Sequence, residues 1–86
     1  MKLYSVFDSK GNFFDKPFIQ RNAGDASRGF QMAVNDEKQD SMLKRFPADY
    51  TLFELGEWDE LQGTVKMHEA KINLGTGLQY VKSSVN

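Results

Sequence analysis

The sequence predicts an α+β fold: a small antiparallel sheet of about four to five strands, in β-β-α-β-β order, with one helix packed on one face. Three observations predict it. Residues 2–19 are rich in β-forming side chains and are divided by a cluster of turn formers. Residues 22–35 place apolar side chains three and four residues apart, which is the helical period. Residues 50–68 contain two further strand-like runs around a polar loop.

The first predicted hairpin spans residues 2–19. Its turn contains Gly11, which adopts positive φ at no steric cost. Pro17 cannot donate a hydrogen bond to a neighbouring strand, so the second strand should be short, bulged or at an edge. Phe13 and Phe14 are adjacent, and neighbouring side chains of a strand point to opposite faces. Only one of these two rings can therefore join the core easily.

The predicted helix begins at Asn22, a good N-cap residue, with Asp25 at the position of a capping-box acid. Gly29 inside the helix costs about 1 kcal/mol relative to alanine. We expect it to allow a close approach of the helix to the sheet. Residues 42–47 carry a short apolar turn ended by a proline, and this turn should pack against the core.

The second half of the chain predicts a central strand at residues 50–55, because apolar side chains fall on both of its faces. Gly56 should break this strand, with pairing resumed near Trp58 after a bulge. The strand at residues 64–68 should direct its valine and methionine inward. Residues 70–86 either add a last strand near residues 78–82 or form an extended tail that exchanges with a partner chain.

Composition limits the class of protein. The chain has 86 residues, enough for one domain over residues 1–86, and it has no cysteine, which excludes disulfides and cysteine-bound metals. The net charge is −1, so any nucleic-acid binding needs a local basic face. No apolar run reaches the roughly 20 residues that span a bilayer, and the start of the chain lacks the apolar core of a signal peptide. We expect a soluble intracellular protein that does not bind membranes.

Catalytic and metal-binding patterns are weak. His68 is the single histidine, and one histidine without a second histidine or a cysteine does not make a metal site; we expect it to be exposed. Residues 75–77 resemble the start of a dinucleotide loop but lack its third glycine. The acids near residues 54–60 fit either metal-dependent hydrolysis or, more commonly, a solvated edge. We therefore expect a protein that is not an enzyme and has no cofactor and no metal.

Positive charge and aromatic rings are interleaved in the first half of the chain. A basic groove with stacking rings is how proteins hold single-stranded nucleic acid without reading its sequence. The candidates for phosphate contacts are Lys10, Lys16, Arg21, Arg28, Lys44 and Arg45, and the candidates for base stacking are Tyr4 and Phe14. The alternative is that the rings belong to the core and the basic residues to an ordinary surface.

Trp58 lies among acidic residues of the second predicted hairpin. An exposed tryptophan surrounded by charge is a frequent hot spot of protein interfaces. This hairpin therefore predicts a different function, in which the chain is a protein–protein adaptor that uses Trp58.

Nearly the whole chain resembles the small nonstructural protein of gokushoviruses, single-stranded DNA phages of the microvirus family. The likeness begins at residues 2–10, continues through Pro17-Phe18, Arg21 and the predicted helix, and is strongest at residues 46–56, which read Phe-Pro-Ala-Asp-Tyr-Thr-Leu-Phe-Glu-Leu-Gly. It resumes at Trp58-Asp59. The resemblance implies a protein of the infected host cytoplasm that is absent from the mature virion. It also implies DNA binding, or assistance to single-stranded genome synthesis.

From the residues and the resemblance together we expect a phage nonstructural protein that binds single-stranded DNA non-specifically. It would assist single-stranded genome synthesis or the coupling of synthesis to packaging. A homodimer or larger homo-oligomer is expected, because repeated weak sites raise avidity. Phage replication or capsid proteins are the partners expected for the alternative adaptor function.

Overall fold

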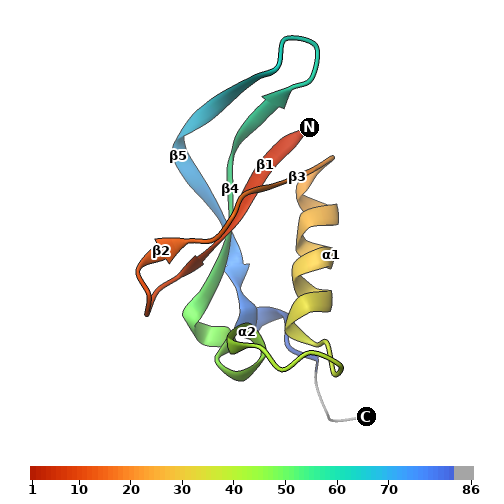
Figure 1. Cartoon of the computed structure of the whole chain (residues 1–86), viewed down its shortest axis with the longest axis vertical. Coiled ribbons are helices and arrows are strands. Elements are labelled where there is room, and N and C mark those ends of the chain that lie inside the picture. The colour runs from red at the N-terminus through yellow and green to blue at the C-terminus, as the bar shows by residue number, and fades with distance from the viewer. Residues whose placement is uncertain (83–86) are drawn as a thin grey trace.

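The protein, described here by a computed structural model for residues 1–82, has an α+β fold (Figure 1). Its elements in chain order are β1 (Lys2–Asp8), β2 (Phe13–Phe14), β3 (Phe18–Gln20), α1 (Ala23–Val34), α2 (Met42–Arg45), η1 (Pro47–Asp49), β4 (Tyr50–Asp59), β5 (Thr64–Thr76) and η2 (Gly77–Tyr80). The strands form one five-stranded antiparallel sheet. The predicted fold class is confirmed.

The sheet is built around β1 and β4. The strand order is β2-β1-β4-β5, and β3 also pairs with β1. The first half of β1 pairs with β3, and the second half pairs with β2. The second arm of the predicted hairpin therefore consists of two short strands on either side of Pro17. The interruption is expected, because proline has no N–H group to donate to the neighbouring strand.

The β4–β5 hairpin is longer than predicted. Gly56 does not end β4, because pairing continues to Asp59. The pairs Glu54–Ile72 and Gly56–Met67 lie close together on β4 but several residues apart on β5, so β5 bows at this point (Figure 1). A Cβ atom at Gly56 would collide with the backbone of β5, and only glycine fits this close approach.

The core lies between α1 and one face of the sheet. The buried side chains of α1 are Ala26, Phe30 and Val34, four residues apart, and they pack with Tyr4 of β1 and Leu52 of β4. Figure 1 shows α1 along a single side of the sheet. This core is small, and within residues 1–82 no helix packs on the opposite face of the sheet.

Local signals place the helices where they were predicted. The Asn22 side chain accepts a hydrogen bond from the backbone N–H of Asp25 at 2.8 Å, which caps α1. The Ser41 side chain accepts one from the N–H of Lys44 at 3.2 Å and caps α2. Partly buried Leu43 packs α2 against the core.

Three expectations are wrong. Gly29 is exposed, and a Cβ atom there would meet nothing within 4 Å, so no close approach explains it. Val65 and Met67 do not face inward, since they are 46% and 53% exposed. Residues 77–80 form η2 instead of a strand, because Gly75, at φ 118°, redirects the chain and a capping box at Thr76 starts the turn.

The predicted tail is also corrected in part. Residues 70–76 belong to β5, which pairs with β4 of the same chain and is a strand, not an extended tail. The end of the predicted tail, residues 83–86, lies outside the described residues. In the part that is described, no helix is long and apolar enough to cross a membrane.

Candidate nucleic-acid interface

The face of the sheet opposite α1 is covered by no helix of residues 1–82 (Figure 1). We call it the open face. Strand register assigns side chains to it, because directly paired residues share a face and successive residues alternate. Its residues include Leu3, Ser5, Phe7, Phe14, Ile19, Thr51, Phe53, Leu55, Trp58, Val65, Met67, Glu69, Lys71, Asn73 and Thr76.

Three aromatic rings gather on the open face. The Phe14 ring centroid lies 4.7 Å from that of Phe7 and 5.7 Å from that of Phe53. These distances are typical of favourable aromatic pairs. The Lys71 ammonium lies over the Phe14 ring, 5.6 Å from its centroid. Phe14 is nonetheless 39% exposed. The cluster therefore presents an oriented ring to solvent with one cation beside it.

The open face continues along the β4–β5 hairpin. Leu55 is buried, whereas Trp58 is half-buried and pairs with exposed Val65. An antiparallel sheet with one solvated face normally carries polar side chains on that face. Here the alternation puts aliphatic and aromatic side chains there instead, and such patches mark interaction sites.

Tyr4 is not a stacking residue, which corrects the prediction. It is fully buried on the face that α1 covers, and its ring stacks on Phe18 with centroids 5.8 Å apart. Its hydroxyl donates to Glu54 Oε1 at 3.4 Å. Burial, with the Glu54 carboxylate as the next cause, raises the pKa of Tyr4 to about 12. The ring belongs to the core and is not accessible to a base.

Four of the six predicted basic residues do not share a face with Phe14. Arg21 precedes α1 and forms an ion pair with Asp25 at 2.8 Å. Arg28 is on the exposed side of α1, and Lys44 and Arg45 are on α2. These four residues belong to the helical layer, on the side of the sheet away from the open face.

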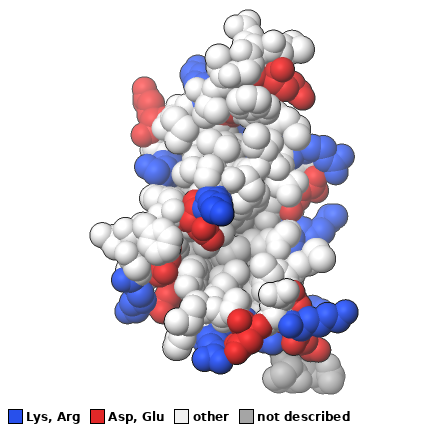
Figure 2. All heavy atoms as spheres, in the orientation of Figure 1, with Lys and Arg blue, Asp and Glu red and all other residues white. Residues whose placement is uncertain are grey.

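The remaining two predicted cations, Lys10 and Lys16, lie in the turns that flank β2. Figure 2 shows Lys and Arg spread around the outline of the molecule, most of them next to Asp or Glu. Arg45, for example, donates twice to Asp40, at 2.8 and 2.6 Å. The expected basic groove is therefore not formed by these residues.

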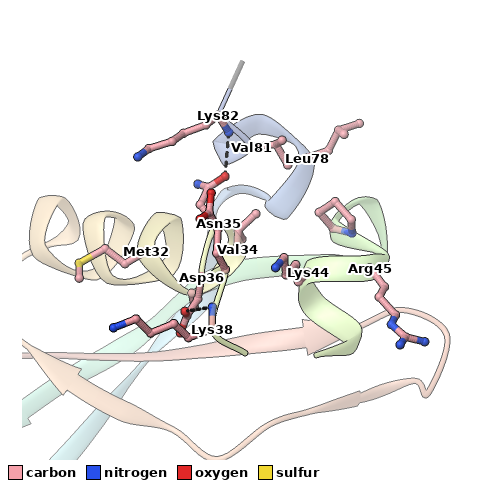
Figure 3. Close-up of a pocket in the computed structure, with 13 residues that line it drawn as sticks. Met32, Val34, Asn35, Asp36, Lys38, Lys44, Arg45, Leu78, Val81 and Lys82 are labelled. Atoms are coloured by element: carbon pink, nitrogen blue, oxygen red, sulfur yellow. Dashed lines mark hydrogen bonds between the residues drawn. The ribbon is translucent and has the colours of Figure 1, made fainter. Parts of the chain in front are cut away.

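A hollow of about 1220 Å³ lies between the end of α1, α2 and η2 (Figure 3). It is lined by four basic residues, Lys38, Lys44, Arg45 and Lys82. Figure 3 shows Lys38 and Lys82 extending to one side and Arg45 pointing away at the other end. Their charged groups do not converge on a common point, so the hollow does not form an anion site.

Trp58 lies on the hairpin, as predicted. The neighbouring acids Glu57 and Asp59 are engaged by other groups of the hairpin and of β1. Glu57 pairs with Lys2, whose hydrogen bond lowers the pKa of Glu57. The Asp59 side chain accepts hydrogen bonds from the N–H groups of Leu61 and Gln62, at 3.0 and 3.1 Å, and so shapes the turn. These acids stabilise the hairpin and do not form a metal site.

His68 is partly buried and not exposed as expected. Its Nε2 lies 2.8 Å from Glu54 Oε2, so β5 is tied to the core at the bow. Among residues 1–82, no group of three or more His, Asp or Glu side chains could hold a metal ion.

Sequence reasoning missed Lys71, Phe7 and Phe53 as members of the candidate site. The alternation of residues 50–55 put Phe53 on one face, but it did not say which face the helix covers. Lys71 lies in the segment that we expected to be a tail. Without knowing that β5 extends through this segment, the sequence could not assign Lys71 to the sheet.

These features define a small α+β protein with a helix on one face of its sheet and an aromatic, uncovered opposite face. The chain matches the family model described as Phage ORF5 protein over residues 1–80. It therefore belongs to this family of phage proteins. No curated protein and no solved structure matches the chain.

Proposed function

We propose that this phage protein binds single-stranded DNA non-specifically through the open face. The observation that supports the proposal is the cluster of Phe7, Phe14 and Phe53 with Lys71 over the central ring. Antiparallel sheets with helices behind them and aromatic rings in front stack the bases of single strands in other protein classes. Each stacked base contributes about 1–3 kcal/mol.

In the cell, binding of this kind would assist single-stranded genome synthesis or its coupling to packaging. The resemblance described above supports an origin in a gokushovirus and a nonstructural role in the host cytoplasm. The protein in this proposal is a binding protein and not an enzyme, and it needs no cofactor or metal. A homodimer or larger homo-oligomer would join several open faces on one strand and raise avidity.

The test compares two adjacent phenylalanines by fluorescence anisotropy with a labelled single-stranded oligonucleotide. Phe14→Leu keeps an apolar side chain on the open face but removes the ring, so affinity should fall about tenfold. Phe13→Leu is the matched control. Phe13 is in the same strand and 54% exposed, but it points to the other face. Circular dichroism establishes that both variants are folded.

Equal losses in the two variants, or unchanged affinity in Phe14→Leu, would contradict the proposal. A duplex of the same sequence provides the second control. It should bind weakly, because paired bases present no free ring face for stacking.

A second candidate function is the protein–protein adaptor, and the position of Trp58 favours it. The ring lies on the part of the open face farthest from the Phe14 cluster, on the hairpin that extends past α1 (Figure 1). A replication or capsid protein of the phage would be its partner. Trp58→Ala should then abolish capture of that partner and leave single-strand binding unchanged. Loss of single-strand binding instead would place Trp58 in the DNA site.

A further inference from the structure

We infer that the open face recognises the bases of its ligand and not its phosphates. The ligand class is then any single strand with unpaired bases, DNA or RNA, bound with little dependence on salt. This inference rests on the proposed function and states which part of the strand supplies the affinity.

The first argument is that most of the positive charge lies away from the aromatic rings; Lys10 and Lys16 are in the turns that flank β2. Arg21, Arg28 and the residues around the hollow belong to the helical layer. Lys2 pairs with Glu57, whose register partner is Lys66, on the same side as α1. Among the described residues, the cation in contact with the aromatic cluster is Lys71. Glu69, two residues before Lys71, lies on the same face by alternation and offsets that charge.

The second argument is that polar groups of the open face already have partners within the protein. The Ser5 hydroxyl donates to the carbonyl oxygen of Asp15 at 2.6 Å. Asn73 Oδ1 accepts from the N–H of Gly75 at 2.8 Å. Sequence is read by hydrogen bonds to base edges. With these two groups engaged, stacking on a ring is the main contact left for a base, and every base has a ring face.

The salt dependence of binding follows from the number of cations that contact the phosphates of the strand. Each phosphate contact to a single strand contributes about −0.7 to the slope of log K against log salt concentration. A groove of six cations would give a slope of about −4. One cation, Lys71, gives a slope of about −0.7. Binding by the open face should therefore survive a rise in salt that would abolish binding by a basic groove.

The experiment uses the full-length protein and four labelled probes of equal length: an oligothymidylate, an oligouridylate, an abasic strand with the same phosphates, and a duplex. We expect the first two to bind with a slope between zero and about −1. The abasic strand should bind at least tenfold more weakly than the oligothymidylate. An abasic strand that binds equally well, or a slope near −4, would overturn the inference.

The pattern of failure separates the two proposals. Binding of no probe at low salt would refute the proposed function itself. Binding of the abasic strand and the oligothymidylate alike would leave DNA binding standing and refute base recognition. Binding of the oligothymidylate but not the oligouridylate would restrict the ligand to DNA and overturn the part of the inference that includes RNA.

Three variants test whether Lys71 is the cation that contacts the phosphates. Lys71→Met should bring the salt slope close to zero, whereas Lys66→Met, on the same strand but the opposite face, should leave the slope unchanged. The double variant Arg21→Ala, Arg28→Ala should also bind like the unchanged protein. A larger loss in that double variant than in Lys71→Met would place the strand on the helical layer and overturn the inference.

Discussion

Gly29 lowers the stability of α1, and no contact in the structure requires a glycine at this position. It lies in the middle of α1 on the exposed side, and nothing lies within 4 Å of the position of its missing Cβ atom. Alanine is favoured over glycine in a helix by about 1 kcal/mol. We predict that Gly29→Ala raises the free energy of unfolding by about this amount, measured by urea denaturation.

Gly56→Ala is the control for this prediction, because a Cβ atom there would collide with the carbonyl oxygen of Lys66. It should destabilise the protein or prevent folding. A loss of stability in Gly29→Ala would show that α1 has a contact on that side which the structure does not contain.

Tyr4 gives the protein a predictable sensitivity to alkali. Its pKa is raised to about 12 by burial and by Glu54, from an ordinary value near 10. Between these values the unfolded chain loses the phenolic proton and the folded protein keeps it. The contribution of Tyr4 to stability is therefore complete below about pH 10 and falls as the pH rises toward 12.

The measurement is the urea midpoint as a function of pH from 8 to about 11. Tyr4→Phe should show a shallower decline than the unchanged protein, because it has no phenol at this position to titrate. Some decline should remain, because the raised pKa values of Lys2 and Tyr50 also reduce stability as the pH rises. Identical slopes in the two proteins would contradict the assignment of Tyr4 to the core.

Among the elements, α1 is the one that sequence predicts best. Its cap at Asn22 and its apolar stripe are local signals. The cap is found as predicted, and Ala26, Phe30 and Val34 of the stripe are buried, whereas Ala33, also predicted for the stripe, is exposed. Asn22→Ala removes the side-chain acceptor for the Asp25 N–H group and should cost about 1 kcal/mol in unfolding free energy. Asn22→Asp, which keeps an acceptor, should restore most of it. Equal losses in the two variants would contradict the role of the Asn22 side-chain oxygen as the acceptor that caps the helix.

The length of β5 was not predictable from local patterns. Residues 64–68 read as a strand, but the continuation depends on the bow between Met67 and Ile72 and on the backbone approach at Gly56. Both are contacts between segments distant in sequence. Gly75 and Gly77 suggested a flexible turn, whereas the structure pairs Gly75 with Leu52 near the end of β5 and places Gly77 against Pro47.

At the scale of the whole molecule, the candidate site was predictable only in part. Phe14 and Trp58 were predicted for two different functions, base stacking and a protein interface, and strand register places both on the open face. Their binding roles stay predictions. Tyr4 and the six cations were chosen from their proximity in sequence. Which face of the sheet a helix covers is a property of packing, and it places the cations of α1 and α2 behind the sheet.

The most direct measurement of the central claim is a titration of the isotope-labelled protein with an oligothymidylate, followed by the amide signals in two-dimensional NMR. Binding by the open face should shift the signals of Phe7, Phe14, Phe53 and Lys71, with those of Arg21 and Arg28 unchanged. Shifts confined to α1 and α2, with the open face unaffected, would contradict the account and assign nucleic-acid binding to the helical layer.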